Sequence, residues 1–112
     1  MVILDKSIIT SGSGKYRVWV ERHQVGSDLV YVLGGGEQPH VGGMVLCEPG
    51  KKPVVISRQG HYDAVVLEIV AEAACKKHQV VVVVVGGIHI DNASKNEIDM
   101  VIQNCRSLIP SL

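Results

Sequence analysis

Hydrophobic and polar residues alternate in the first third of the chain, and this pattern predicts β-strands. In YRVWVERH, one face would carry Tyr16, Val18 and Val20, because successive side chains of a strand point to opposite sides. A turn at residues 26–28 leads into LVYVL at 29–33, so we expect an antiparallel hairpin. Two more strands, at 41–47 and 54–57, flank a turn with prolines and glycine. Together these segments predict a meander of four strands.

The spacing of hydrophobic residues changes after residue 61. From Tyr62 to Ala74 they recur every three or four positions, which predicts a helix that ends near Lys77. Residues 80–85 are all valine, and such a β-branched run predicts a central strand buried on both faces. Ser94 and Glu97 have the spacing of a capping box, so a second helix is expected to begin there.

The resulting order, ββββαβα, predicts an α+β fold. We expect a two-layer sandwich in which two helices cover one face of a mainly antiparallel five-stranded sheet. Residues 1–15 contain SGSG and are predicted to form a flexible N-terminal arm, with 16–112 as a single domain. Two helices cannot cover both faces of such a sheet, so the second face should meet another protein surface. We therefore predict a homodimer.

Charge and composition exclude several classes of partner. The 112 residues carry 11 basic and 11 acidic side chains, so nothing favours binding to nucleic acid. The longest apolar run is far shorter than the roughly 20 residues that span a bilayer, and the apolar start is too brief for a signal peptide. We expect a cytoplasmic protein without a membrane partner. The three cysteines lack the spacing of a disulfide framework or a zinc site.

Three loops combine glycine with histidine, each next to a predicted strand. They are GGGEQPH at 34–40, GHYD at 60–63 and GGIHID at 86–91. Glycine serves where a backbone needs positive φ or must approach a ligand closely, and binding residues concentrate on loops. The recurrence of glycine with histidine predicts one cluster at a rim of the sheet, although three ordinary turns could have the same residue composition.

Two kinds of site could use these loops. The GHYD loop leads into the first helix, whose free N–H groups could bind a phosphate. His89 and Asp91 lie two residues apart and, with His40 or His61, could form a two-histidine, one-carboxylate metal site. A simple turn also explains Asp91.

The ordered set GGGEQPHVGG, GHYD and VVVGGIHID, followed by a helix, resembles the LpdD-like family of prenylated flavin chaperones. That family is itself related in fold to proteasome assembly chaperones. The resemblance covers residues 34–108. It implies a small accessory protein rather than an enzyme, one that helps a UbiD-like decarboxylase acquire or mature its prenylated FMN.

The resemblance also implies a cofactor site, for prenylated FMN or FMN, at the matching positions of the three loops. These positions are Gly35, Pro39, His40 and Gly42, then Gly60, His61 and Asp63, then Gly87, His89 and Asp91. Tyr62 stands where the family tends to have lysine, which puts a phosphate contact through that lysine in doubt. Two alternatives remain open: a proteasome-assembly-chaperone-like module that binds no ligand, and a metal-dependent enzyme using histidine and aspartate.

Overall fold

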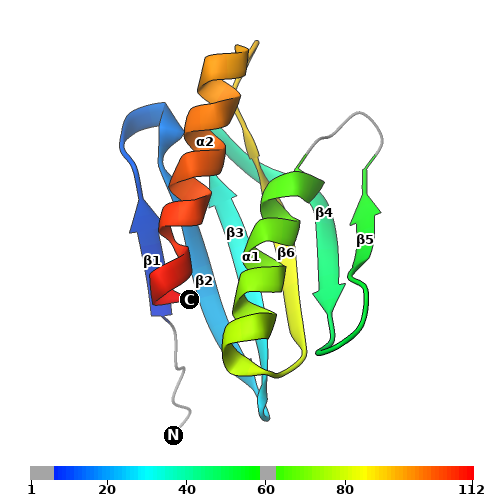
Figure 1. Cartoon of the computed structure of the whole chain (residues 1–112). Helices are drawn as coiled ribbons and strands as arrows, with labels where there is room; N and C mark the ends of the chain where they lie inside the picture. Colours follow the sequence, from blue (N-terminus) through cyan, green and yellow to red (C-terminus); the bar gives the residue numbers. More distant parts are fainter. Residues whose placement is uncertain (1–6, 59–62) are drawn as a thin grey trace, which may run out of the picture.

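The protein folds into one six-stranded sheet with two α-helices on one of its faces (Figure 1). The computed structural model describes residues 7–58 and 63–112. In chain order the elements are β1 (Ser7–Ser11), η1 (Gly14–Tyr16), β2 (Val18–Val25), β3 (Asp28–Gly35), β4 (Gln38–Cys47), β5 (Val54–Ser57), α1 (Ala64–His78), β6 (Val82–His89), α2 (Lys95–Ser107) and η2 (Ile109–Ser111). The predicted α+β sandwich is confirmed, with six strands instead of five.

The extra strand comes from the segment that we expected to be a flexible arm. β1 pairs antiparallel with β2, with Ile9 opposite Val20, and Ile9 packs against the hydrophobic core. That burial and the ladder of backbone hydrogen bonds explain why residues 7–11 join the sheet. The part of the predicted arm before residue 7 lies outside the described residues.

The predicted four-strand meander is wrong, because β6 lies between β3 and β4. The strand order is β1-β2-β3-β6-β4-β5, and β6 runs parallel to β3 and antiparallel to β4. The other pairings are antiparallel. A continuous valine strand is most stable when strands flank it on both sides. Because β6 occupies the place next to β3, β4 pairs with β6 instead of with β3.

The core lies between the sheet and the helices. Val82 and Val84 of β6 are fully buried and pack with Leu67 and Val70 of α1. Ser94 caps α2 as predicted: its side chain accepts a hydrogen bond from the Glu97 backbone N–H, and the Glu97 side chain accepts one from the Ser94 N–H. The second helix therefore begins where predicted, and α1 ends at His78, next to the predicted Lys77.

The other face of the sheet is largely apolar apart from the paired Glu21 and His23 of β2, and no described helix covers it. Strand alternation and register place on this face the residues that alternate with the core positions. They include Trp19, Val30, Val32, Met44, Leu46, Val54, Ile56, Val83 and Val85. We call these residues the open face. Val83 and Val85 are only half-buried, so the expectation that the valine strand is buried on both sides does not hold within one chain.

Candidate functional site

Asp63 is the centre of a polar group that joins β4, α1 and β6. Its carboxylate is buried, with 8% of the residue exposed. The Oδ2 atom lies 2.8 Å from His40 Nε2, and Oδ1 accepts a hydrogen bond of 2.8 Å from the Ile88 backbone N–H. Asp63 immediately precedes α1 but makes no side-chain cap to it. The carboxylate instead holds the start of the helix against two strands.

Two glycines make room for this carboxylate. A Cβ atom at Gly42 would overlap Asp63 Oδ2, and one at Gly87 would lie 2.9 Å from Asp63 Cγ. Neither position has positive φ. These glycines are required because a side chain of the protein itself approaches the backbone, whereas the sequence suggested approach by a ligand.

The imidazoles of His40 and His89 face each other beside this group. Their ring centroids are 5.8 Å apart and their planes are tilted by 57°. His89 Nε2 lies 2.7 Å from Asp91 Oδ1, and the Asp91 backbone N–H donates to Glu37 Oε1. Each imidazole therefore has one nitrogen engaged by a carboxylate, and this contact sets its orientation.

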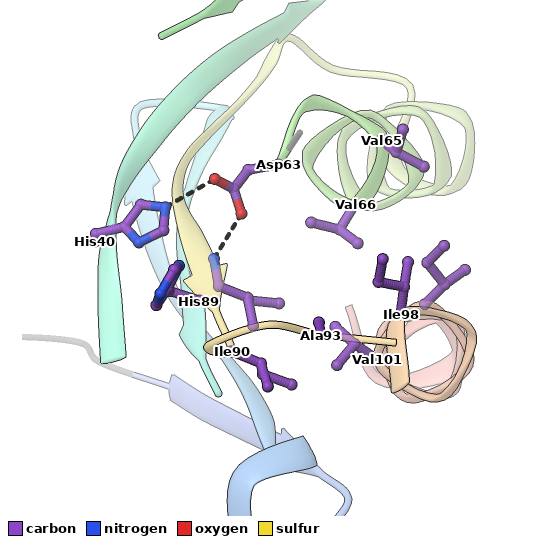
Figure 2. A pocket seen from close by; sticks show the side chains of 11 residues that line it. His40, Asp63, Val65, Val66, His89, Ile90, Ala93, Ile98 and Val101 are labelled. Carbon is purple, nitrogen blue, oxygen red and sulfur yellow. Dashed lines mark hydrogen bonds and ion pairs between the residues drawn. The ribbon is translucent and has the colours of Figure 1, made fainter. Parts of the chain in front are cut away.

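The polar group forms one end of a cavity of about 350 Å³. Figure 2 shows the imidazoles on one side of the view and aliphatic side chains from both helices on the other. The aliphatic wall consists of Val65 and Val66 from α1, Ile88 and Ile90 from β6 and the segment after it, Ala93 just before α2, and Ile98, Val101 and Ile102 on α2. A few polar groups at one end of an apolar cavity are typical of small-molecule sites.

The structure brings together part of the predicted set of site residues. His40, Asp63 and His89 line the cavity, and Asp91 contacts it through His89. Gly87 lies under Asp63, while Gly35 and Pro39 are absent from the cavity wall. Gly60 and His61 lie outside the described residues, as does Tyr62, so of the loop that was expected to lead to a phosphate site only Asp63 is described.

The proposed metal site is not formed by the part of the chain that the structure describes. Among residues 7–58 and 63–112, no three or more His, Cys, Asp or Glu side chains are placed to hold a metal ion. His89 and Asp91 do lie together, but they pair with each other, and His40 pairs with Asp63.

Sequence reasoning missed the aliphatic wall. Ile98, Val101 and Ile102 share the apolar face of α2, and only Val101 is buried among them. The spacing i, i+3, i+4 shows which residues share a helix face, and it cannot show whether that face meets the core or an open cavity.

Comparison with known proteins identifies the family. The model of the prenylated flavin chaperone LpdD-like domain matches residues 12–112. The chain belongs to this LpdD-like family. No curated protein matches it.

The fold of this LpdD-like domain also occurs in a solved structure. The chain is similar to one from the "Crystal Structure of a Novel Chaperone Complex for Yeast 20S Proteasome Assembly", with a TM-score of 0.58. The two share 10% sequence identity, and the match covers 98% of each chain. At that identity the likeness concerns the fold alone.

Of the helices that the structure describes, neither could cross a membrane.

Proposed function

We propose that this protein is a cytoplasmic accessory chaperone that helps a UbiD-like decarboxylase acquire or mature prenylated FMN. The observation that supports this most is the paired imidazoles of His40 and His89, held at the polar end of an apolar cavity. The family model, which names a prenylated flavin, supports the choice of ligand.

The polar end can form hydrogen bonds with the polar part of a flavin nucleotide. Nε2 of each imidazole is engaged by a carboxylate, and both imidazoles line the cavity. The ring nitrogens of imidazole can donate or accept a hydrogen bond. Such a site can hold and release a cofactor, which is what a delivery protein must do.

Co-expression with a UbiD-like decarboxylase tests the proposal. We expect the decarboxylase to contain several-fold less prenylated FMN when this chain is omitted, and also when it carries His40→Ala together with His89→Ala. His78→Ala is the control, because His78 is the last residue of α1, at the end of the helix opposite Asp63, and does not line the cavity. Equal cofactor occupancy with and without the chain would refute the proposal.

The second candidate is an assembly chaperone that acts through a protein surface and binds no ligand. The open face favours it, because the Trp19 ring packs on Gly34 there, and Met44, Val54 and Ile56 are exposed beside half-buried valines. This function requires that Trp19→Ala abolishes activity while His40→Ala and His89→Ala have no effect.

We also propose that the open face pairs two copies of the chain as a homodimer. The face is largely apolar apart from the paired Glu21 and His23, and a second copy can bury such a patch against the same patch across a twofold axis. Met44→Asp should convert a dimer to a species of 12.1 kDa in light scattering at micromolar concentration. Met100→Asp, a change at a comparably exposed methionine on α2, should leave the dimer intact. A wild-type monomer would refute this interface.

A further inference from the structure

We infer that the free edge of β5 is a docking site for an extended segment of a partner protein, which adds to the sheet as a further strand. The segment that fits this edge has apolar residues in its middle and an acidic residue near each end. This inference goes beyond the proposed function, because it concerns a protein contact and does not depend on a flavin.

The backbone of β5 has hydrogen-bonding groups that face outward. β5 forms the edge of the sheet opposite β1 (Figure 1), and its only neighbour among the described strands is β4. The Arg58 backbone N–H donates to the Gly42 carbonyl oxygen at 2.9 Å. Along an antiparallel ladder, residues that bond to the neighbouring strand alternate with residues that do not. In the register of β4 and β5, the N–H and C=O groups of Val55 and Ser57 therefore point away from β4, toward the free edge.

The side chains of β5 are apolar and exposed. Val54, Val55 and Ile56 are 55%, 41% and 58% exposed, and no residue of the strand is charged. Proteins usually protect an edge strand with a charged residue, a proline within the strand or a bulge. The ladder between β4 and β5 has none of these. Because β-branched residues also favour strand pairing, both the backbone and the side chains of β5 are suited to the addition of a strand.

The charges at the two ends of β5 select the kind of partner. Lys51 and Lys52 precede the strand and Arg58 follows it, while Glu48 is the one acidic residue from 48 to 58 and is paired with Lys51 at 2.7 Å. If two copies of this chain paired along β5 about a twofold axis, Lys52 of each copy would come beside Arg58 of the other. Like charges that face each other destabilise strand pairing. A partner segment with an acidic residue near each end forms opposite-charge pairs at the same places.

The test follows the exchange of backbone amide protons with water by NMR while a synthetic peptide is added. The peptide is EVTVTVE with blocked ends. Exchange at Val55 and Ser57 should slow several-fold as this peptide binds, and exchange at Ile8 and Thr10 of β1 should not change. KVTVTVK should bind about tenfold more weakly, because two opposite-charge pairs become like-charge pairs. EVPVPVE, in which proline removes alternate N–H groups, should not slow exchange.

Val55→Pro tests the edge from the side of the protein. This change removes an N–H that points away from β4 and breaks no hydrogen bond within the sheet, and proline is tolerated on the outer side of edge strands. Ile8→Pro is the matched control. By the same alternation, carried across β2 from the bond between the Gly36 N–H and the Arg17 carbonyl, the N–H groups of Ile8 and Thr10 point away from β2. Val55→Pro should abolish the binding of EVTVTVE, and Ile8→Pro should preserve it, with both variants folded by circular dichroism.

Three results would overturn this inference. The first is unchanged exchange at Val55 and Ser57 of the wild type in millimolar EVTVTVE, and the second is equal slowing by KVTVTVK. The third is the conversion of a dimer of this chain to a monomer by Val55→Pro in light scattering, which would show that a second copy occupies the edge. All three are independent of the proposed function, which is tested by the cofactor content of the decarboxylase.

Discussion

The contact between Asp63 and Gly42 gives a quantitative test of how the site is built. Asp63→Ala removes the partner of His40 and leaves the Ile88 N–H without its acceptor. A lost hydrogen bond to a charged group and an unsatisfied buried donor together suggest a loss of about 3 kcal/mol in the free energy of unfolding. Gly42→Ala places a methyl group where the carboxylate lies, and overpacking of this kind costs about 2 kcal/mol.

The two changes should not be additive, because the atoms that a Cβ at Gly42 would overlap most closely belong to the Asp63 carboxylate. Once Asp63→Ala has removed that carboxylate, Gly42→Ala should cost at least about 1 kcal/mol less than it does in the wild type. The assay is urea unfolding of the wild type, both single variants and the double variant, followed by circular dichroism.

Gly43 provides the matched control for this cycle. A Cβ there would overlap the backbone carbonyl of Ile56 on β5, and Asp63→Ala does not remove that obstacle. Gly43→Ala should therefore destabilise both backgrounds equally. Additivity of Gly42→Ala with Asp63→Ala, within about 0.5 kcal/mol, would refute the claim that this glycine exists to admit the carboxylate.

Three further predictions concern the rest of the molecule. The hydrogen bond from Lys15 lowers the pKa of Glu97 to about 2 from 4.5, so its stabilising effect should be complete above pH 4.5 and lost as the pH falls towards 2. Glu97→Gln should flatten that part of a plot of urea midpoint against pH, and an unchanged slope would contradict the assignment. Ser94→Ala removes the N-cap of α2 and should lower the free energy of unfolding by about 1 kcal/mol; no change in the urea midpoint would count against the cap. Burial raises the pKa of Cys105 to about 12, so its thiol should react with an aromatic disulfide reagent at pH 8 far more slowly in the native protein than in urea, and rapid native labelling would disprove the burial.

Local signals in the sequence predicted most of the fold. The capping box at Ser94 fixed the start of α2, and the valine run identified β6 as a central strand. The sequence could not show that β6 enters between β3 and β4, since strand order depends on contacts between distant segments. The sequence analysis also missed β1, because the serine- and glycine-rich residues that follow this strand resemble a linker. The strand is stabilised by its pairing with β2, a contact that its own residues do not reveal.

The candidate site was predictable at its polar end only. Histidines next to glycines suggested a cluster, and His40 and His89 do lie together. The role of the glycines was misread, because Gly42 and Gly87 accommodate Asp63. Which apolar residues line a cavity depends on how far apart α1 and α2 are held, and hydrophobic spacing along one helix carries no information about that distance.

Histidine-resolved NMR during a titration with prenylated FMN tests the central claim most directly. If the cofactor binds beside the paired imidazoles, the ring resonances of His40 and His89 should shift together and saturate at one equivalent. His23, on β2 and paired with Glu21, should not respond. Shifts of His23 equal to those of His40 and His89, or no shift of any histidine, would contradict a flavin site in this cavity.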